Sequence, residues 1–105
     1  MEISKGATVC NDITIEGTHA VKIGSGSVVS PRCIFRPITG PIVIDQNNLL
    51  EERSVVENSN PSGEPLRIGS YNHFKVDSYI CCSAVGQGNI CEPKSVLSKG
   101  SVICK

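Results

Sequence analysis

Apolar residues recur at every sixth position through most of this chain. The period is clearest when four segments are aligned: IGSGSVVSPRCIF (23–35), IDQNNLLEERSVV (44–56), IGSYNHFKVDSYI (68–80) and VGQGNICEPKSVL (85–97). An aliphatic residue opens each segment, and further apolar residues follow six and twelve places later. NNLLEERSVVEN (47–58) also contains good helix formers, but only its six-residue spacing agrees with the other segments. The chain is therefore predicted to consist of short repeated strands.

The aligned segments define three columns of large apolar residues. The first contains Ile23, Ile44, Ile68, Val85 and Ile103, the second Val29, Leu50, Phe74 and Cys91, and the third Phe35, Val56, Ile80 and Leu97. A first, less regular repeat keeps the spacing with Ile3, Val9 and Ile15. Three hexads would thus make one turn of a solenoid, with one column on each of three sides.

Small side chains precede two of these columns by two positions. They are Ser27, Asn48, Asn72 and Asn89 before the second column, and Cys33, Ser54, Ser78 and Ser95 before the third. Because side chains alternate between the two faces of a strand, these residues should point inward with the large residues that follow them. The stacked Asn and Ser side chains should then hydrogen-bond to their counterparts in neighbouring coils.

We predict an all-β fold, a triangular parallel β-helix of about five coils that forms a single domain over residues 1–105. The coils should begin near residues 3, 23, 44, 68, 85 and 103. The largest insertion, NSNPSGEP (58–65), should form an external loop. A period of six does not determine handedness, but similarity to hexapeptide-repeat proteins implies a left-handed helix.

Composition and charge narrow the classes of function. The chain has no Trp and only two Phe and two Tyr, and its apolar set is rich in Val and Ile, which favours strands. Lys plus Arg equals Asp plus Glu, so the chain has no electrostatic footprint for nucleic acid or an anionic membrane. No segment is long and apolar enough for membrane insertion, and MEISKGATV lacks the regions of a signal peptide. We expect a cytoplasmic protein.

The cysteines stand at positions 10, 33, 81, 82, 91 and 104. In a secreted chain they would suggest a disulfide scaffold, but without a secretion signal they should stay reduced. No CxxC pair occurs. We therefore interpret the cysteines as small apolar filler and expect neither a zinc site nor another cofactor.

Few residues are candidates for catalysis. His19 and His73 should lie about three coils apart, roughly 14 Å, which is too far to share one ion within a chain. Asp77 and the pair Glu51–Glu52 are expected at corners, where charge is solvated. Three glycines follow the first column and are interpreted as corner residues that permit a tight turn, not as a phosphate cradle: Gly24, Gly69 and Gly86.

Two stripes of apolar residues should face outward. Before the third column these are Ile34, Val55, Tyr79 and Val96, and before the second Val28, Leu49, His73 and Ile90. The positions before the first column are more mixed: Lys22, Val43, Arg67, Ala84 and Val102. Exposed apolar ladders on a flat sheet usually mark an association surface. We therefore predict a partner interface at Ile34, Val55, Tyr79 and Val96, with Val28, Leu49 and Ile90 as the second choice.

Longer stretches resemble the dynactin subunit 6 family, the smaller of the two hexapeptide-repeat subunits of dynactin. They are ITGPIVIDQNNLLEERSVVEN and, after a Pro-containing insertion, RIGSYNHFKVDSYICCSAVGQGNICEPKSVLSKGSVI. KGATVC and VKIGSGSVVSPRCIF fit the opening coils of the same family. The resemblance covers essentially the whole chain. It implies a non-catalytic component of dynactin, the multisubunit activator of cytoplasmic dynein in microtubule-based transport.

The resemblance also implies partners. These would be the related subunit 5, the actin-related cap protein and the large zinc-binding subunit 4, all at the pointed end of the actin-related filament, which contributes to cargo-adaptor engagement. The family continues through more coils and a helix along the prism, whereas this chain stops at ICK, an unfinished coil whose strand edges should need a cap or partner.

The hexapeptide-repeat architecture by itself leaves another class of function open. Proteins of this architecture include acyltransferases and γ-class carbonic anhydrases, both of which depend on histidines. A trimeric enzyme of either kind would require His19 or His73 at a subunit boundary.

Overall fold

The computed structural model describes residues 1–97 and the backbone of residues 102–103. This part of the chain contains sixteen strands and no helix, so no helix in it is long and apolar enough to cross a membrane. The strands are β1 Glu2–Ile3, β2 Thr8–Val9, β3 Thr14–Ile15, β4 Val21–Ile23, β5 Val28–Val29, β6 Ile34–Pro37, β7 Ile42–Ile44, β8 Leu49–Leu50, β9 Val55–Asn58, β10 Leu66–Ile68, β11 His73–Phe74, β12 Tyr79–Ile80, β13 Ala84–Val85, β14 Ile90–Cys91, β15 Val96–Leu97 and β16 Val102–Ile103.

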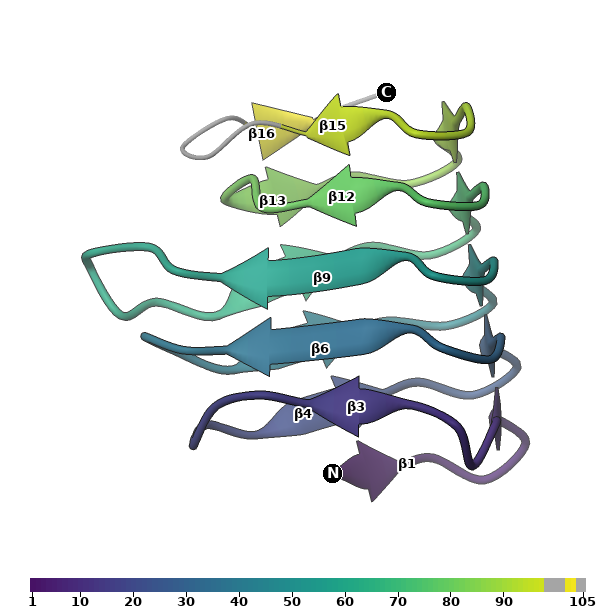
Figure 1. Ribbon diagram of the computed structural model, residues 1–105, viewed down its shortest axis with the longest axis horizontal. Coiled ribbons are helices and arrows are strands. Elements are labelled where there is room, and N and C mark those ends of the chain that lie inside the picture. The colour runs from purple at the N-terminus through teal and green to yellow at the C-terminus, as the bar shows by residue number, and fades with distance from the viewer. Residues whose placement is uncertain (98–101, 104–105) are drawn as a thin grey trace.

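These strands form three parallel sheets that wrap into one solenoid (Figure 1). Sheet A has the order β1-β4-β7-β10-β13-β16, sheet B β14-β11-β8-β5-β2 and sheet C β15-β12-β9-β6-β3. Each strand pairs with the strand three places later in the chain, so one coil contributes one strand to each sheet. In Figure 1 the chain rises from the N-terminus in a left-handed path. The predicted left-handed parallel β-helix of about five coils is confirmed.

The predicted columns are the registers of the three sheets. In sheet B, Val9, Val29, Leu50, Phe74 and Cys91 follow one another in a single register. The first and third columns are in register in the same way in sheets A and C. The side chain of one predicted column member, Ile103, lies outside the described residues.

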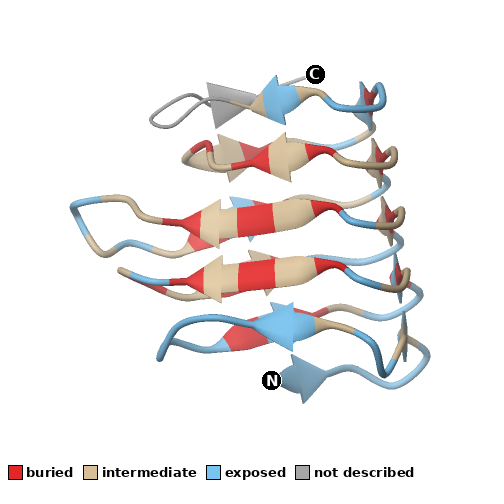
Figure 2. Ribbon diagram, in the orientation of Figure 1, coloured by how far each residue is buried: buried red, intermediate tan, exposed pale blue. Residues whose placement is uncertain are grey.

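The core occupies the middle coils, as the buried bands of Figure 2 show. Its largest fully buried side chains are Phe35, Phe74, Ile23, Ile42, Ile44, Leu50, Leu66, Ile68, Ile80, Val21, Val29 and Val56. Sheet A differs from the other two sheets because the residues two positions before its column are large: Val21, Ile42 and Leu66. In these three coils sheet A therefore supplies two large side chains each, opposite the small residues of sheets B and C.

The predicted polar ladder exists for asparagine. The backbone N–H of Asn72 donates to Asn48 Oδ1 (2.9 Å), and that of Asn89 donates to Asn72 Oδ1 (2.8 Å). The amides of Asn48 and Asn72 therefore each accept a hydrogen bond from the backbone of the next coil, so the ladder joins side chain to backbone. For Ser78 and Ser95 the prediction was wrong, because each hydroxyl donates to the carbonyl three residues earlier in its own corner, at 2.6 Å.

At every corner but the one at Asp12, the residue three positions before the second or third column has left-handed backbone. Arg32, Asn47, Arg53, Tyr71, Asp77 and Lys94 have φ between 56° and 64° there, and Gly6, Gly26 and Gly88 take the equivalent positions. Gly24, Gly69 and Gly86 have no such φ, so the interpretation that they permit the turn was wrong. Gly24 and Gly69 instead allow close stacking, since a Cβ would lie 2.6 Å from Asp45 C and 2.8 Å from Gly86 O.

The longest connection projects from the edge between sheets C and A, after β9 (Figure 1). Asn58, predicted to be the first residue of this loop, is instead the last residue of β9 and is buried. Its Nδ2 donates to Pro41 O (2.9 Å) and to Glu64 O (2.8 Å). The buried Asn58 amide thus links the loop at residues 59–65 to the connection between β6 and β7 in the preceding coil.

Candidate interaction surfaces

Residues 1–97 enclose no pocket, and no three His, Cys, Asp or Glu side chains among them gather to hold a metal ion. The candidate sites in this part of the molecule are therefore outer surfaces. Sheets B and C each present one such surface, formed by the predicted outward rows.

The sheet C stripe consists of Ile34, Val55, Tyr79 and Val96. The four residues are consecutive partners in the register of β6, β9, β12 and β15, so the prediction that they share one outward row is confirmed. Ile34, Val55 and Tyr79 are half-buried, and Val96 is 66% exposed. Their role in binding a partner stays a prediction.

A charged row that the pattern of apolar residues does not predict runs beside the sheet C stripe. Arg36 lies between two carboxylates, with Nε 3.2 Å from Glu16 Oε1 and Nη1 2.9 Å from Glu57 Oε1. The Tyr79 hydroxyl donates to Glu57 Oε1 at 2.6 Å, and this hydrogen bond raises the pKa of Tyr79. The three charged residues each follow a third-column residue, and that shared position was the signal in the sequence.

The sheet B stripe, formed by Val28, Leu49 and Ile90, also lies in one outward row. Val28 is 38% exposed and Ile90 67%, while Leu49 is half-buried. His73 interrupts the row between Leu49 and Ile90 and points outward, as predicted, where its Nε2 contacts Glu51 Oε2. The stripe is therefore apolar on both sides of one polar pair.

Carboxylates at the corner between sheets B and C form ion pairs across coils, so the expectation that they are simply solvated was wrong. Arg53 Nε and Nη2 donate to Asp77 Oδ1 (2.9 Å) and Oδ2 (3.2 Å), and these bonds lower the pKa of Asp77. Glu52 lies 3.8 Å from Arg32 and 3.7 Å from Arg53. Exposed pairs of this kind contribute little stability each.

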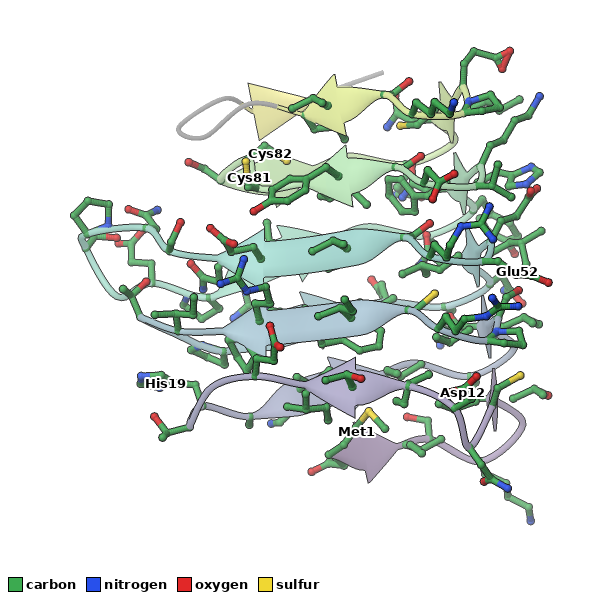
Figure 3. The ribbon with its side chains drawn as sticks, viewed as in Figure 1. Met1, Asp12, His19, Glu52, Cys81 and Cys82 are labelled. Carbon is green, nitrogen blue, oxygen red and sulfur yellow. The ribbon has the colours of Figure 1, made fainter. Side chains whose placement is uncertain are left out.

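The two histidines do not come together. His19 lies in the loop between β3 and β4, at the edge of the molecule opposite Glu52 in Figure 3. His73 lies on the outer face of sheet B, three coils later in the chain. The structure therefore leaves each histidine with different neighbours.

The cysteines described in the structure fit the interpretation as small apolar filler. Cys33, Cys82 and Cys91 are buried, and Cys10 is half-buried. Burial raises the pKa of the Cys33 and Cys82 thiols to about 11, so both stay protonated near neutral pH. Cys81, beside Cys82 in Figure 3, donates through Sγ to Leu97 O at 3.3 Å. Cys104 lies outside the described residues.

Comparison with known proteins gives the family. No protein-family profile matches the chain. The chain is 41% identical over 97 residues to dynactin subunit 6 of Dictyostelium discoideum, covering 90% of this chain and 49% of that protein. It is 36% identical over 100 residues to dynactin subunit 6 of Caenorhabditis elegans, covering 95% and 54%. The chain belongs to the dynactin subunit 6 family. The Xenopus tropicalis member is 32% identical over 112 residues, covering 98% of this chain and 55% of its own length.

The similarity to dynactin subunit 6 thus covers nearly all of this chain, including every coil that carries a candidate surface. The chain spans about half the length of these relatives.

Proposed function

We propose that this chain is a non-catalytic structural component of a dynactin complex, cytoplasmic and associated with the cytoskeleton. One observation carries the proposal: dynactin subunit 6 proteins from an amoeba, a nematode and a frog match 90%, 95% and 98% of the chain. Apolar stripes on flat outer sheets support it, because they suit association with other proteins.

The resemblance of the chain to its family suggests the place in the complex. The proposed neighbours are a subunit 5 relative, with which the chain would form a hetero-association, the actin-related cap protein and subunit 4. At the pointed end of the actin-related filament, the chain would act as a scaffold that supports dynein-driven transport and cargo-adaptor engagement.

The sheet C stripe is the proposed docking surface for one of these neighbours. Its four apolar side chains are spaced by one coil each, about 4.8 Å, on a flat sheet. Tyr79 adds an aromatic ring whose hydroxyl is already bound to Glu57, so burying the ring would not leave that hydroxyl without a partner. A surface of this kind can be covered without a large desolvation cost.

Changing Val55→Glu together with Val96→Glu should abolish incorporation of the chain into the dynactin complex. Two carboxylates would enter an apolar interface unpaired, while the core behind them would be unchanged because both residues face outward. Incorporation is measured by co-sedimentation of the tagged chain with dynactin, and folding by far-UV circular dichroism, which should not change.

A matched control places the same two glutamates on another face, with Val43→Glu and Ala84→Glu on the outer side of sheet A. This variant should incorporate normally. Incorporation of the Val55 and Val96 double variant at the normal level would show that the sheet C stripe is not the docking surface.

The membership itself is tested by affinity purification of the tagged chain from its own cytosol, with mass spectrometry of the proteins retained. Recovery of the subunit 5 relative and of actin-related proteins supports the proposal. Recovery of the chain alone, as a trimer, would contradict it and direct attention to His19 and His73.

A further inference from the structure

The charged row beside the sheet C stripe has more negative than positive charge. It consists of Glu16, Arg36 and Glu57, which follow one another in three successive coils. Two carboxylates thus share one guanidinium. The row therefore carries one surplus negative charge along one side of an apolar stripe.

The contacts of Arg36 show which carboxylate carries that surplus. Arg36 Nη1 lies 2.9 Å from Glu57 Oε1, and the Glu57 side chain is only 14% exposed. Arg36 Nε lies 3.2 Å from Glu16 Oε1, yet among the described residues this buried nitrogen has no hydrogen-bond partner. The Glu16 side chain is 54% exposed. Arg36 is therefore matched to Glu57, and the surplus charge lies on Glu16.

The other side of the stripe has no such surplus. The turns at the corner between sheets B and C are residues 11–12, 31–32, 52–53, 76–77 and 93–94. Three acidic and three basic residues stand there: Asp12, Glu52, Asp77, Arg32, Arg53 and Lys94. A partner on the sheet C stripe would thus meet balanced charge on one side and a surplus carboxylate on the other.

A partner that covers the stripe also covers Glu16. Glu16 lies two residues beyond Thr14, the register partner of Ile34, so its backbone is about 8 Å from that of Ile34. A stable interface covers roughly 800 Å² on each protein, which extends well beyond that separation. Glu16 would lose water in such an interface, and a carboxylate that loses water without meeting an opposite charge is costly.

We propose that the partner of the sheet C stripe places a Lys or Arg side chain against Glu16. The occupant is an apolar surface of another dynactin subunit with a basic residue at the border that meets the charged row. This inference rests on the proposed function. It adds to that function the chemistry of the partner and one recognition residue of this chain.

The experiment measures binding of the purified chain to dynactin prepared from cells that lack this chain, by biolayer interferometry. Glu16→Gln keeps the shape and removes the charge, so it should weaken binding about tenfold. Glu16→Lys should weaken it about a hundredfold, because two positive charges would then meet. The wild-type chain should bind more weakly in 500 mM than in 50 mM KCl, and Glu16→Gln should respond less to salt.

Glu2→Gln and Glu2→Lys are the matched controls, since Glu2 is an exposed carboxylate of the same coil on the outer side of sheet A. They should leave binding unchanged. All four variants should keep the Tm within about 4 °C of wild type, because an exposed ion pair contributes at most about 1 kcal/mol.

The outcomes separate the two proposals. If the wild-type chain binds and Glu16→Gln or Glu16→Lys binds as tightly, the basic partner residue is overturned and the proposed function stands. An equal loss in the Glu2 variants overturns it in the same way. A fall of the Tm in proportion to the loss of binding shows a structural role for Glu16 and also overturns it. No binding of the wild-type chain overturns the proposed function together with this inference.

Discussion

Phe74→Ala is expected to lower the free energy of unfolding by about 3–5 kcal/mol, the usual cost of emptying a buried aromatic site. Phe74 is 0% exposed and lies in the central register of sheet B between Leu50 and Cys91. At each level of a solenoid, the side chains of a single coil fill the core. The coils above and below cannot move into the cavity left by Phe74→Ala without breaking their own strand pairing. Urea denaturation followed by far-UV circular dichroism measures the loss.

Two further variants make this expectation specific to the cavity. Phe74→Leu should cost only about 1–2 kcal/mol, because leucine already occupies the same register position in the coil before, at Leu50. Val28→Ala, on the outer face of the same sheet, should stay within about 0.5 kcal/mol of wild type. A loss below about 1 kcal/mol for Phe74→Ala would mean that the residue does not fill the core.

The second large effect is expected for Asn72→Leu, with a loss of about 3–5 kcal/mol from three hydrogen bonds that cannot be replaced. Asn72 is buried; its Nδ2 donates to Gly69 O (2.9 Å) and Gly86 O (2.8 Å), and its Oδ1 accepts from the backbone N–H of Asn89 (2.8 Å). Leucine has nearly the shape of asparagine, so the loss reports the polar contacts and not the packing. The measurement is again urea denaturation.

Asn89→Leu provides the comparison within the same ladder. Asn89 is only half-buried, and its Nδ2 contact, to Gln87 O, is long at 3.5 Å. Its replacement should cost less than about 1.5 kcal/mol, since water can reach the groups left behind. Equal losses of stability at Asn72 and Asn89 would argue that the hydrogen bonds of the ladder add nothing beyond the packing of these side chains.

Most of the core could be predicted from the sequence because a six-residue period places each large residue in a definite register. Val29, Leu50 and Phe74 are such a case, since one position is repeated in three coils and each repeat confirms the others. The outward rows followed directly, because side chains alternate along a strand. Residues 47–58 contain strands despite their helix propensity, because the neighbouring coils on both sides supply strand partners.

The candidate surfaces were predicted less completely. The sheet C stripe was identified, but the ion pairs of Arg36 beside it were not, because both join residues about one coil apart in sequence.

For this protein, the sequence by itself determined the repeat, the inward columns and the outward rows, because each depends only on spacing along the chain. The tertiary structure decided which polar groups meet: Asn72 with Asn48 and Asn89, and Arg53 with Asp77. These partners are separated by 17 to 24 residues along the chain. Coils of unequal length bring them together, so their contacts follow from the stacking and not from the local pattern.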